Sequence, residues 1–134
     1  MAFNVGDKAE MKRKFSAEEV DLFAVLSEDK NPIHLDEAYS ATTMFKKRIV
    51  HGSFVGSMIS AILGNTLPGH GSIYLSQTMN FKKPVYLEDE VTCIVEVKEL
   101  IADKSIYKLS TNCYNHANEM VVEGNAVILF KPNA

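Results

Sequence analysis

The stretch GSFVGSMISAILGN, residues 52–65, carries apolar or small residues on every side of its helical projection. This pattern predicts a helix that is buried all round, because a helix at a protein surface normally shows a polar stripe. Gly64 and Asn65 are expected to end it, since both residue types tolerate the left-handed conformation that terminates helices. The rest of the chain must then supply a surface that encloses this one helix.

Four segments after residue 71 change to alternating or short apolar runs, which predict β-strands. They are SIYLSQTMNF (72–81), VYLEDEVTCIVEV (85–97), SIYKLSTNCYN (105–115) and VVEGNAVILF (121–130). The gaps at 82–84, 102–104 and 116–119 carry turn residues and are short enough for antiparallel connections. The predicted class is α+β, with a long antiparallel sheet wrapped around one central buried helix.

A second helix is predicted from about residue 17 to 28. Ser16 precedes Glu19 by three residues, the spacing of a capping box. Pro32 should stop the helix, because its ring biases Asn31 away from the α region. Residues 7–15 alternate in part, and residues 31–51 have a mixed composition that we interpret as a structured connection.

The whole chain, residues 1–134, is expected to form a single domain, and it has a formal net charge of −3. No cationic field favours nucleic acid, and no segment reaches the roughly 18 apolar residues of a membrane-spanning helix. Cys93 and Cys113 are too few for a disulfide framework, so a cytoplasmic location is expected. One sheet around one helix leaves edges uncovered, which predicts a homodimer, although Lys98 and Lys108 could protect a monomer.

The segment LSEDKNPIHLDE, residues 26–37, sets the carboxylate of Asp29 and the imidazole of His34 five positions apart across an Asn-Pro break. The two side chains can therefore converge. The alternative is structural: Asp29 forms an Asx turn that leads into Pro32, and His34 is a partly exposed loop residue.

The pattern D-x-N-P-x-H-x-D, followed by IVHG, resembles the R-specific enoyl-CoA hydratases, which are MaoC-like hot-dog proteins. The matching residues are Asp29, Asn31, Pro32, His34, Asp36 and Ile49 to Gly52. The resemblance implies a hot-dog fold and an acyl-CoA substrate. It also implies a hydro-lyase that makes or dehydrates (R)-3-hydroxyacyl thioesters, in fatty acid metabolism or in the supply of polyhydroxyalkanoate precursors. Many members have glycine where this chain has Glu28.

The resemblance implies that Asp29 and His34 form the catalytic pair, and their chemistry suits holding and deprotonating one water. The amide of Gly52, at the start of the buried helix, is our candidate donor to the enolate oxygen, while the alternative is that Gly52 only eases packing. Ser60 is a candidate substrate contact or a serine bonded to its own helix. Leu63 and Val127 suggest an apolar acyl pocket. We interpret His51 as structural.

Several alternatives stay open. The H-x-D spacing of His34 and Asp36, with His51, His70 or His116 as a third ligand, would suit iron, but we expect no metal and no cofactor beyond the coenzyme A of the substrate. Basic side chains at the rim of the site are candidates to bind the phosphates of coenzyme A. The candidate pairs are Lys82 with Lys83 and Lys46 with Arg48. A related dehydratase on acyl-carrier protein, a thioesterase and a non-catalytic acyl-thioester-binding subunit are the competing functions.

Overall fold

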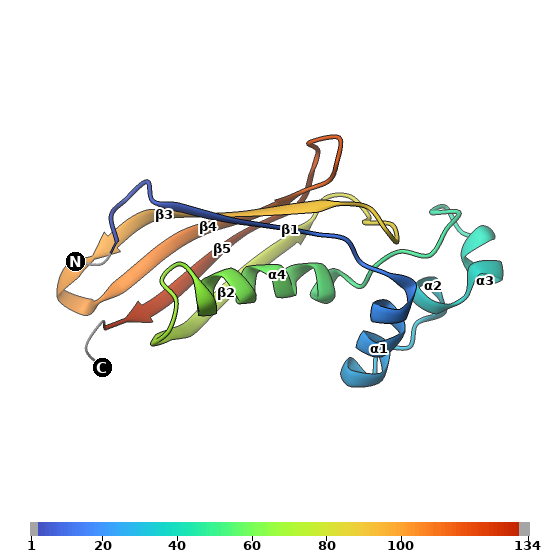
Figure 1. Cartoon of the computed structure of the whole chain (residues 1–134), viewed down its shortest axis with the longest axis horizontal. Coiled ribbons are helices and arrows are strands. Elements are labelled where there is room, and N and C mark those ends of the chain that lie inside the picture. The colour runs from blue at the N-terminus through green and yellow to red at the C-terminus, as the bar shows by residue number, and fades with distance from the viewer. Residues whose placement is uncertain (1–2, 132–134) are drawn as a thin grey trace.

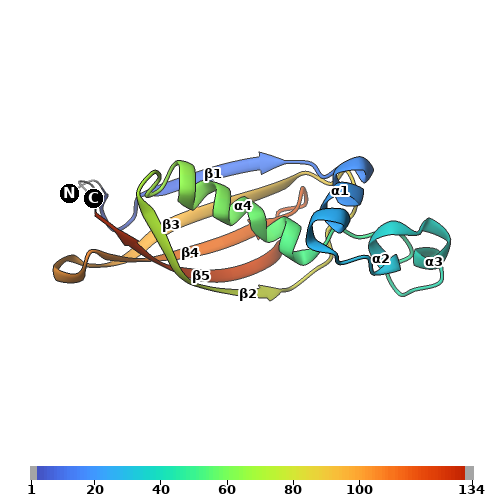
Figure 2. The ribbon, with the colours of Figure 1, turned by 90° about the horizontal axis from the view of Figure 1, so that it is seen from below.

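The computed structural model describes residues 3–131, in which five strands form one antiparallel sheet in the order β1-β3-β4-β5-β2. The strands are β1 (Lys8–Arg13), β2 (Ser72–Phe81), β3 (Val91–Ile101), β4 (Ile106–Tyr114) and β5 (Met120–Phe130). Helix α4 (Gly52–Asn65) lies along one face of this sheet (Figures 1 and 2). This is the α+β arrangement of one helix against a long antiparallel sheet that the residue pattern predicts, and it agrees with the hot-dog fold that the resemblance implies.

Helix α4 is buried on the side that faces the sheet. Its buried side chains pack with inward-facing residues of the strands in a single apolar cluster, which includes Val55, Met58, Ile59, Ile62 and Leu63. Burial of these side chains against the sheet is the main force that holds the helix in place.

The expectation that this helix is buried all round is wrong. Ser53, Ser57, Ser60 and Gly64 recur at intervals of three or four residues and are exposed. The sheet curves around only one side of the helix, and small residues occupy the other side. A uniformly apolar or small composition does not reveal this division, because serine and glycine suit both environments.

Strands β2 and β3 are not hairpin partners, although the short gap between their predicted segments suggested an antiparallel connection. β2 pairs with β5, whereas β3 lies between β1 and β4. Strand β3 also begins at Val91 rather than at residue 85, because residues 85–90 meet the chain that enters α4. There the amide of Val50 donates to the carbonyl of Val85 at 2.8 Å, and Ile49 forms a bridge with Tyr86.

Three short helices precede α4 and extend beyond the end of the sheet (Figure 1): α1 (Ala17–Ser27), α2 (Pro32–Leu35) and α3 (Glu37–Ala41). The capping box of Ser16 and Glu19 is confirmed. Helix α1 ends before Pro32 can act, because Glu28 takes a left-handed conformation with φ of 67°. Pro32 instead begins α2, a position that suits its fixed φ and missing amide hydrogen.

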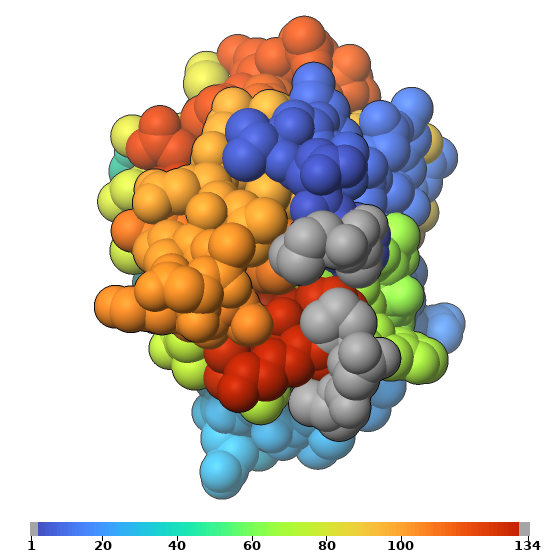
Figure 3. All heavy atoms as spheres, turned by 90° about the vertical axis from the view of Figure 1, so that its left-hand side faces the viewer, coloured from blue at the N-terminus to red at the C-terminus, as the bar shows by residue number. Residues whose placement is uncertain are grey.

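The opposite end of the molecule gathers the N-terminal segment, the β3–β4 connection with its short 3-10 helix Ala102–Lys104, and the end of β5 (Figure 3). The edge strands are β1 and β2, and β2 exposes large apolar side chains: Ile73, Tyr74, Leu75 and Phe81. Within residues 3–131, no helix is long and apolar enough to cross a membrane.

Candidate active site

A cavity of about 750 Å³ opens beside the N-terminus of α4. Its wall joins the α1–α2 connection, the start of α4, the end of β2 and the segment that follows β2. Asp29, His34 and Gly52 all line it, which places three of the predicted site residues around one space. Much of the remaining lining is apolar, including Met79, Phe81, Val85 and Val122.

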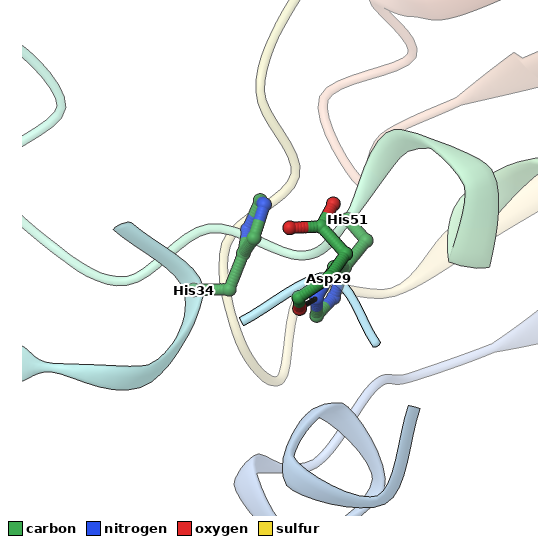
Figure 4. Close-up of side chains that lie close together, drawn as sticks. All are labelled: Asp29, His34 and His51. Carbon is green, nitrogen blue, oxygen red and sulfur yellow. Dashed lines mark hydrogen bonds between the residues drawn. The ribbon is translucent and has the colours of Figure 1, made fainter. Parts of the chain in front are cut away.

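Asp29 and His34 converge from the two sides of the Asn-Pro break (Figure 4). Side-chain ligand atoms of Asp29, His34 and His51 all lie within 4.8 Å of one another. The Asx turn exists as well, since the Asn31 amide donates to Oδ1 of Asp29 at 3.2 Å. The structural and functional interpretations of Asp29 are therefore compatible, because the turn holds the carboxylate at the cavity.

His34 is buried on α2 and is not a partly exposed loop residue. Its Nδ1 lies 2.8 Å from the carbonyl oxygen of Ile49. A carbonyl oxygen only accepts, so Nδ1 carries a hydrogen and Nε2 of the neutral ring keeps its lone pair. Burial lowers the pKa of His34 below its usual 6.5, the hydrogen bond to Ile49 opposes this, and the neighbouring His51 adds to the lowering.

Arg48 binds the main chain of His34. Its Nε donates to the main-chain carbonyl of His34 at 2.7 Å, and its Nη2 pairs with Asp21 of α1 at 2.9 Å. The guanidinium is buried in this arrangement. This arrangement does not favour the prediction that Arg48 contacts a phosphate, because its Nε and Nη2 already connect α1 to α2. The contact stays a prediction.

His51 precedes Gly52 and contacts both members of the pair. Its Nε2 lies 2.9 Å from the main-chain oxygen of Asp29, and its ring stacks on that of His34 with centroids 3.9 Å apart. Phe23 of α1 packs on His51 at a centroid distance of 4.8 Å. The ring is thus enclosed between the elements that carry the site.

Gly52 is the first residue of α4, and His51 offers no side-chain cap to that helix. The first amides of a helix lack intrahelical partners, so this end can donate to an anionic oxygen. A Cβ on Gly52 would lie 2.6 Å from Cε1 of Phe81. Glycine here therefore makes room for the Phe81 ring in the cavity wall.

The cluster of Asp29, His34 and His51 differs from the H-x-D metal set considered from the sequence, in which Asp36 was a ligand. Asp36 instead caps α3 by accepting from the Tyr39 amide at 3.0 Å. The rings of His34 and His51 are stacked at only 26°. In-plane lone pairs of nearly parallel rings do not converge on one ion at the roughly 2 Å that zinc–imidazole bonds require. The geometry suits proton chemistry.

Residues 4–120 match the family described as MaoC like domain. The chain belongs to this family. It is 49% identical over 127 residues to the (R)-specific enoyl-CoA hydratase of Aeromonas caviae, with 95% of each chain covered. The corresponding enzyme of Rhodospirillum rubrum is 42% identical over 124 residues, covering 92% of this chain and 85% of that one. The solved (R)-hydratase of A. caviae, involved in PHA biosynthesis, superposes with a TM-score of 0.95 at 48% identity, covering 97% of this chain and 98% of that one.

Three predicted substrate contacts of this MaoC-like chain do not line the cavity. Ser60 is on the exposed side of α4, and Leu63 is buried in the core one turn further along. Val127 lines a different hollow, beside Lys98 and Lys108. A role for these three residues in substrate binding stays a prediction.

The sequence did not single out Met79 and Phe81 as cavity residues, and it did not predict the partners of His51 and Arg48. Met79 and Phe81 occur in a regular alternating strand, and nothing local shows that the end of β2 reaches the cavity. His51 and Arg48 stood within the family pattern or beside it, but their partners are far apart in sequence. The one local indication was that the polar residues Arg48 and His51 flank the apolar pair Ile49 and Val50, which suggests that both polar side chains have specific partners.

Proposed function

We propose that this chain catalyses the reversible syn addition of water to trans-2-enoyl-CoA, which gives (R)-3-hydroxyacyl-CoA. The observation that carries the proposal is the convergence of Asp29 and His34 on an apolar cavity beside the N-terminus of α4. The names of the A. caviae and R. rubrum enzymes described above support the reaction and its stereochemistry.

One water between Asp29 and His34 is the proposed nucleophile. Two hydrogen bonds of about 2.8 Å at a tetrahedral angle span roughly 4.6 Å. Ligand atoms of the two side chains lie no more than 4.8 Å apart, so one water can contact both. The carboxylate and the Nε2 lone pair of His34 both accept from this water, which directs its oxygen lone pair toward C3 of the enoyl group. As the new C–O bond forms, Asp29 takes the proton.

The electron pair of the C2–C3 double bond moves toward the thioester oxygen, which gains negative charge. We assign the Gly52 amide as its donor, because the uncapped N-terminus of α4 offers both an amide hydrogen and a favourable dipole. C2 then takes a proton on the face where the water was added. This is the proton that Asp29 received from the water, delivered by Asp29 directly or passed through Nε2 of His34. The balance is one water consumed and no redox change, so no cofactor is required.

The cavity suits an acyl thioester. Met79, Phe81 and Val122 provide apolar walls for the acyl chain. Lys82 and Lys83 also line the cavity, and each is about half exposed in ion pairs with Glu123 at 3.9 Å and Glu119 at 2.9 Å. We assign the phosphates of coenzyme A to these two lysines, because a phosphate can exchange with a surface carboxylate at little cost.

The active form is proposed to be a homodimer. Edge strand β2 has an unpaired side and exposes Ile73, Tyr74 and Leu75, and the small residues on the open side of α4 permit close approach of a second copy. A cytoplasmic location stays a prediction.

Loss of the enoyl absorbance of crotonyl-CoA, followed by chiral analysis of the product, tests this function. (R)-3-hydroxybutyryl-CoA is expected. Release of free coenzyme A without hydration would indicate a thioesterase, and binding without turnover would indicate a non-catalytic subunit. Parallel assays with crotonyl-acyl-carrier protein identify the carrier, and a clear preference for the protein-bound substrate would contradict the choice of coenzyme A.

A further inference from the structure

His51 contacts both proposed catalytic residues and connects them to the start of α4. It lies directly before α4, is only 1% exposed, and touches Asp29 through its edge and His34 through its face. We propose that His51 is a positioning residue, which holds the side chains of Asp29 and His34 in place beside the N-terminus of α4. This inference rests on the proposed hydratase function.

The contact to Asp29 is a hydrogen bond across 22 residues of sequence. Nε2 of His51 must donate, because its partner at 2.9 Å is the main-chain carbonyl of Asp29. The other bonds of this exposed connection are local, from the Asp29 amide to Ser27 and from the Asn31 amide to Asp29. The bond from His51 therefore ties the connection to the buried part of the site.

The contact to His34 is a ring stack with centroids 3.9 Å apart and planes inclined by 26°. The Ile49 carbonyl holds one edge of the His34 ring, at Nδ1, while His51 covers one face. Together they restrict rotation of the ring and keep Nε2 directed at the cavity. Phe23, packed on His51 at 4.8 Å, keeps His51 itself in place.

The remaining nitrogen of His51 shows that packing alone does not account for the residue. Nδ1 is buried and has no hydrogen-bond partner among residues 3–131. Burial of an unpaired polar atom is unfavourable, so an apolar ring would fill this space at lower cost. What an apolar ring cannot supply is the donor to the Asp29 carbonyl.

Two substitutions separate the hydrogen bond from the ring. His51→Phe keeps a ring against His34 and Phe23 but removes the donor, and His51→Gln keeps a donor near the position of Nε2. On crotonyl-CoA, His51→Phe should lower kcat at least about tenfold with KM changed less than threefold, because misplaced catalytic groups slow the chemical step. His51→Gln should stay within about threefold of the wild-type kcat, since it restores the bond.

Ser72→Ala is the matched control, because Ser72 likewise donates to a main-chain carbonyl, that of Leu63 in α4 at 3.1 Å, but far from the pair. It should lower the melting temperature without lowering kcat. Three results overturn the proposal: His51→Phe with kcat within threefold of wild type, a loss confined to KM, or His51→Gln as impaired as His51→Phe.

A measurement on the unmodified protein keeps the proposal testable even where His51→Phe does not fold. Long-range ¹H–¹⁵N NMR should place the ring hydrogen on Nε2 of His51 and on Nδ1 of His34. A hydrogen on Nδ1 of His51 would remove the bond to Asp29 and overturn the inference. Because no substrate is needed, failure of the hydratase assay and failure of the positioning role give different results.

Discussion

The Nδ1 atom of His34 donates to the carbonyl of Ile49 across 2.8 Å, and this bond connects the α1–α2 region with the chain that enters α4. It determines the tautomer of the ring, because a carbonyl can only accept. Nε2 is left with a lone pair at the cavity, opposite the carboxylate of Asp29. The proposed roles of both residues follow from this one relationship.

Removal of either member of the pair should abolish most activity. We expect Asp29→Asn and His34→Ala each to lower kcat/KM at least ~10²-fold while the protein still folds, the usual scale for acid–base groups. The double variant should lose much less than the product of the single losses, because both groups act on one water. Steady-state kinetics on crotonyl-CoA provide the measurement.

Asp36→Asn is the matched control for Asp29→Asn, since asparagine caps α3 as well as aspartate does. It should retain full activity. Multiplicative losses in the double variant, or an active Asp29→Asn protein, would remove the pair from the mechanism.

His34 should make the folded state less stable on acidification. Burial lowers the pKa of its ring below 6.5, so between that value and the lower native pKa the unfolded chain binds a proton that the folded protein excludes. Stability contributed by the neutral ring is present above pH 6.5 and is lost as pH falls through this window. Urea unfolding at about pH 7.5 and about pH 5.5 should show a smaller loss of stability in His34→Gln than in the wild type. An equal loss would contradict the shifted pKa.

Gly52→Ala should lower kcat by roughly 10² to 10³, the range for disturbed oxyanion sites. The added methyl group must displace the Phe81 ring, which would be 2.6 Å away, and the thioester then loses its place against the amide. Gly56→Ala is the matched control, because its Cβ would meet Sδ of Met79 at the same 2.6 Å, one turn further into the helix.

The melting temperatures of the two glycine variants should fall by similar amounts, whereas Gly56→Ala should keep most of its kcat. Equal kcat losses in both variants would mean that cavity shape alone, without the Gly52 amide, explains the effect.

Sedimentation should show a dimer, about twice the protomer mass of 14.9 kDa, at micromolar concentration. Leu75→Glu should shift the protein toward monomer, because a charge on an edge strand blocks edge-to-edge pairing. Leu22→Glu on α1 is the control, since the two leucines are exposed to similar extents, 50% and 58%. A fully active wild-type monomer would contradict the proposed assembly.

Local sequence determined much of this protein. The capping box of Ser16 and Glu19, the Asx turn of Asp29 and the strand periods after residue 71 all depend on neighbours within a few residues. The same is true of the two hairpins that join β3, β4 and β5. The convergence of Asp29 and His34 is also nearly local, because only an Asn-Pro break separates them.

Tertiary structure alone decided which surfaces meet. The alternation of residues 72–81 does not show that β2 pairs with β5 rather than with β3. It also does not show that the Phe81 ring packs against Gly52. The positive charge of Arg48 suggested a phosphate contact. In the structure its partners are Asp21 and the main-chain carbonyl of His34. Periodicity and caps encode local conformation, whereas these contacts result from competition among distant segments to bury the same apolar surface and pair the same polar groups.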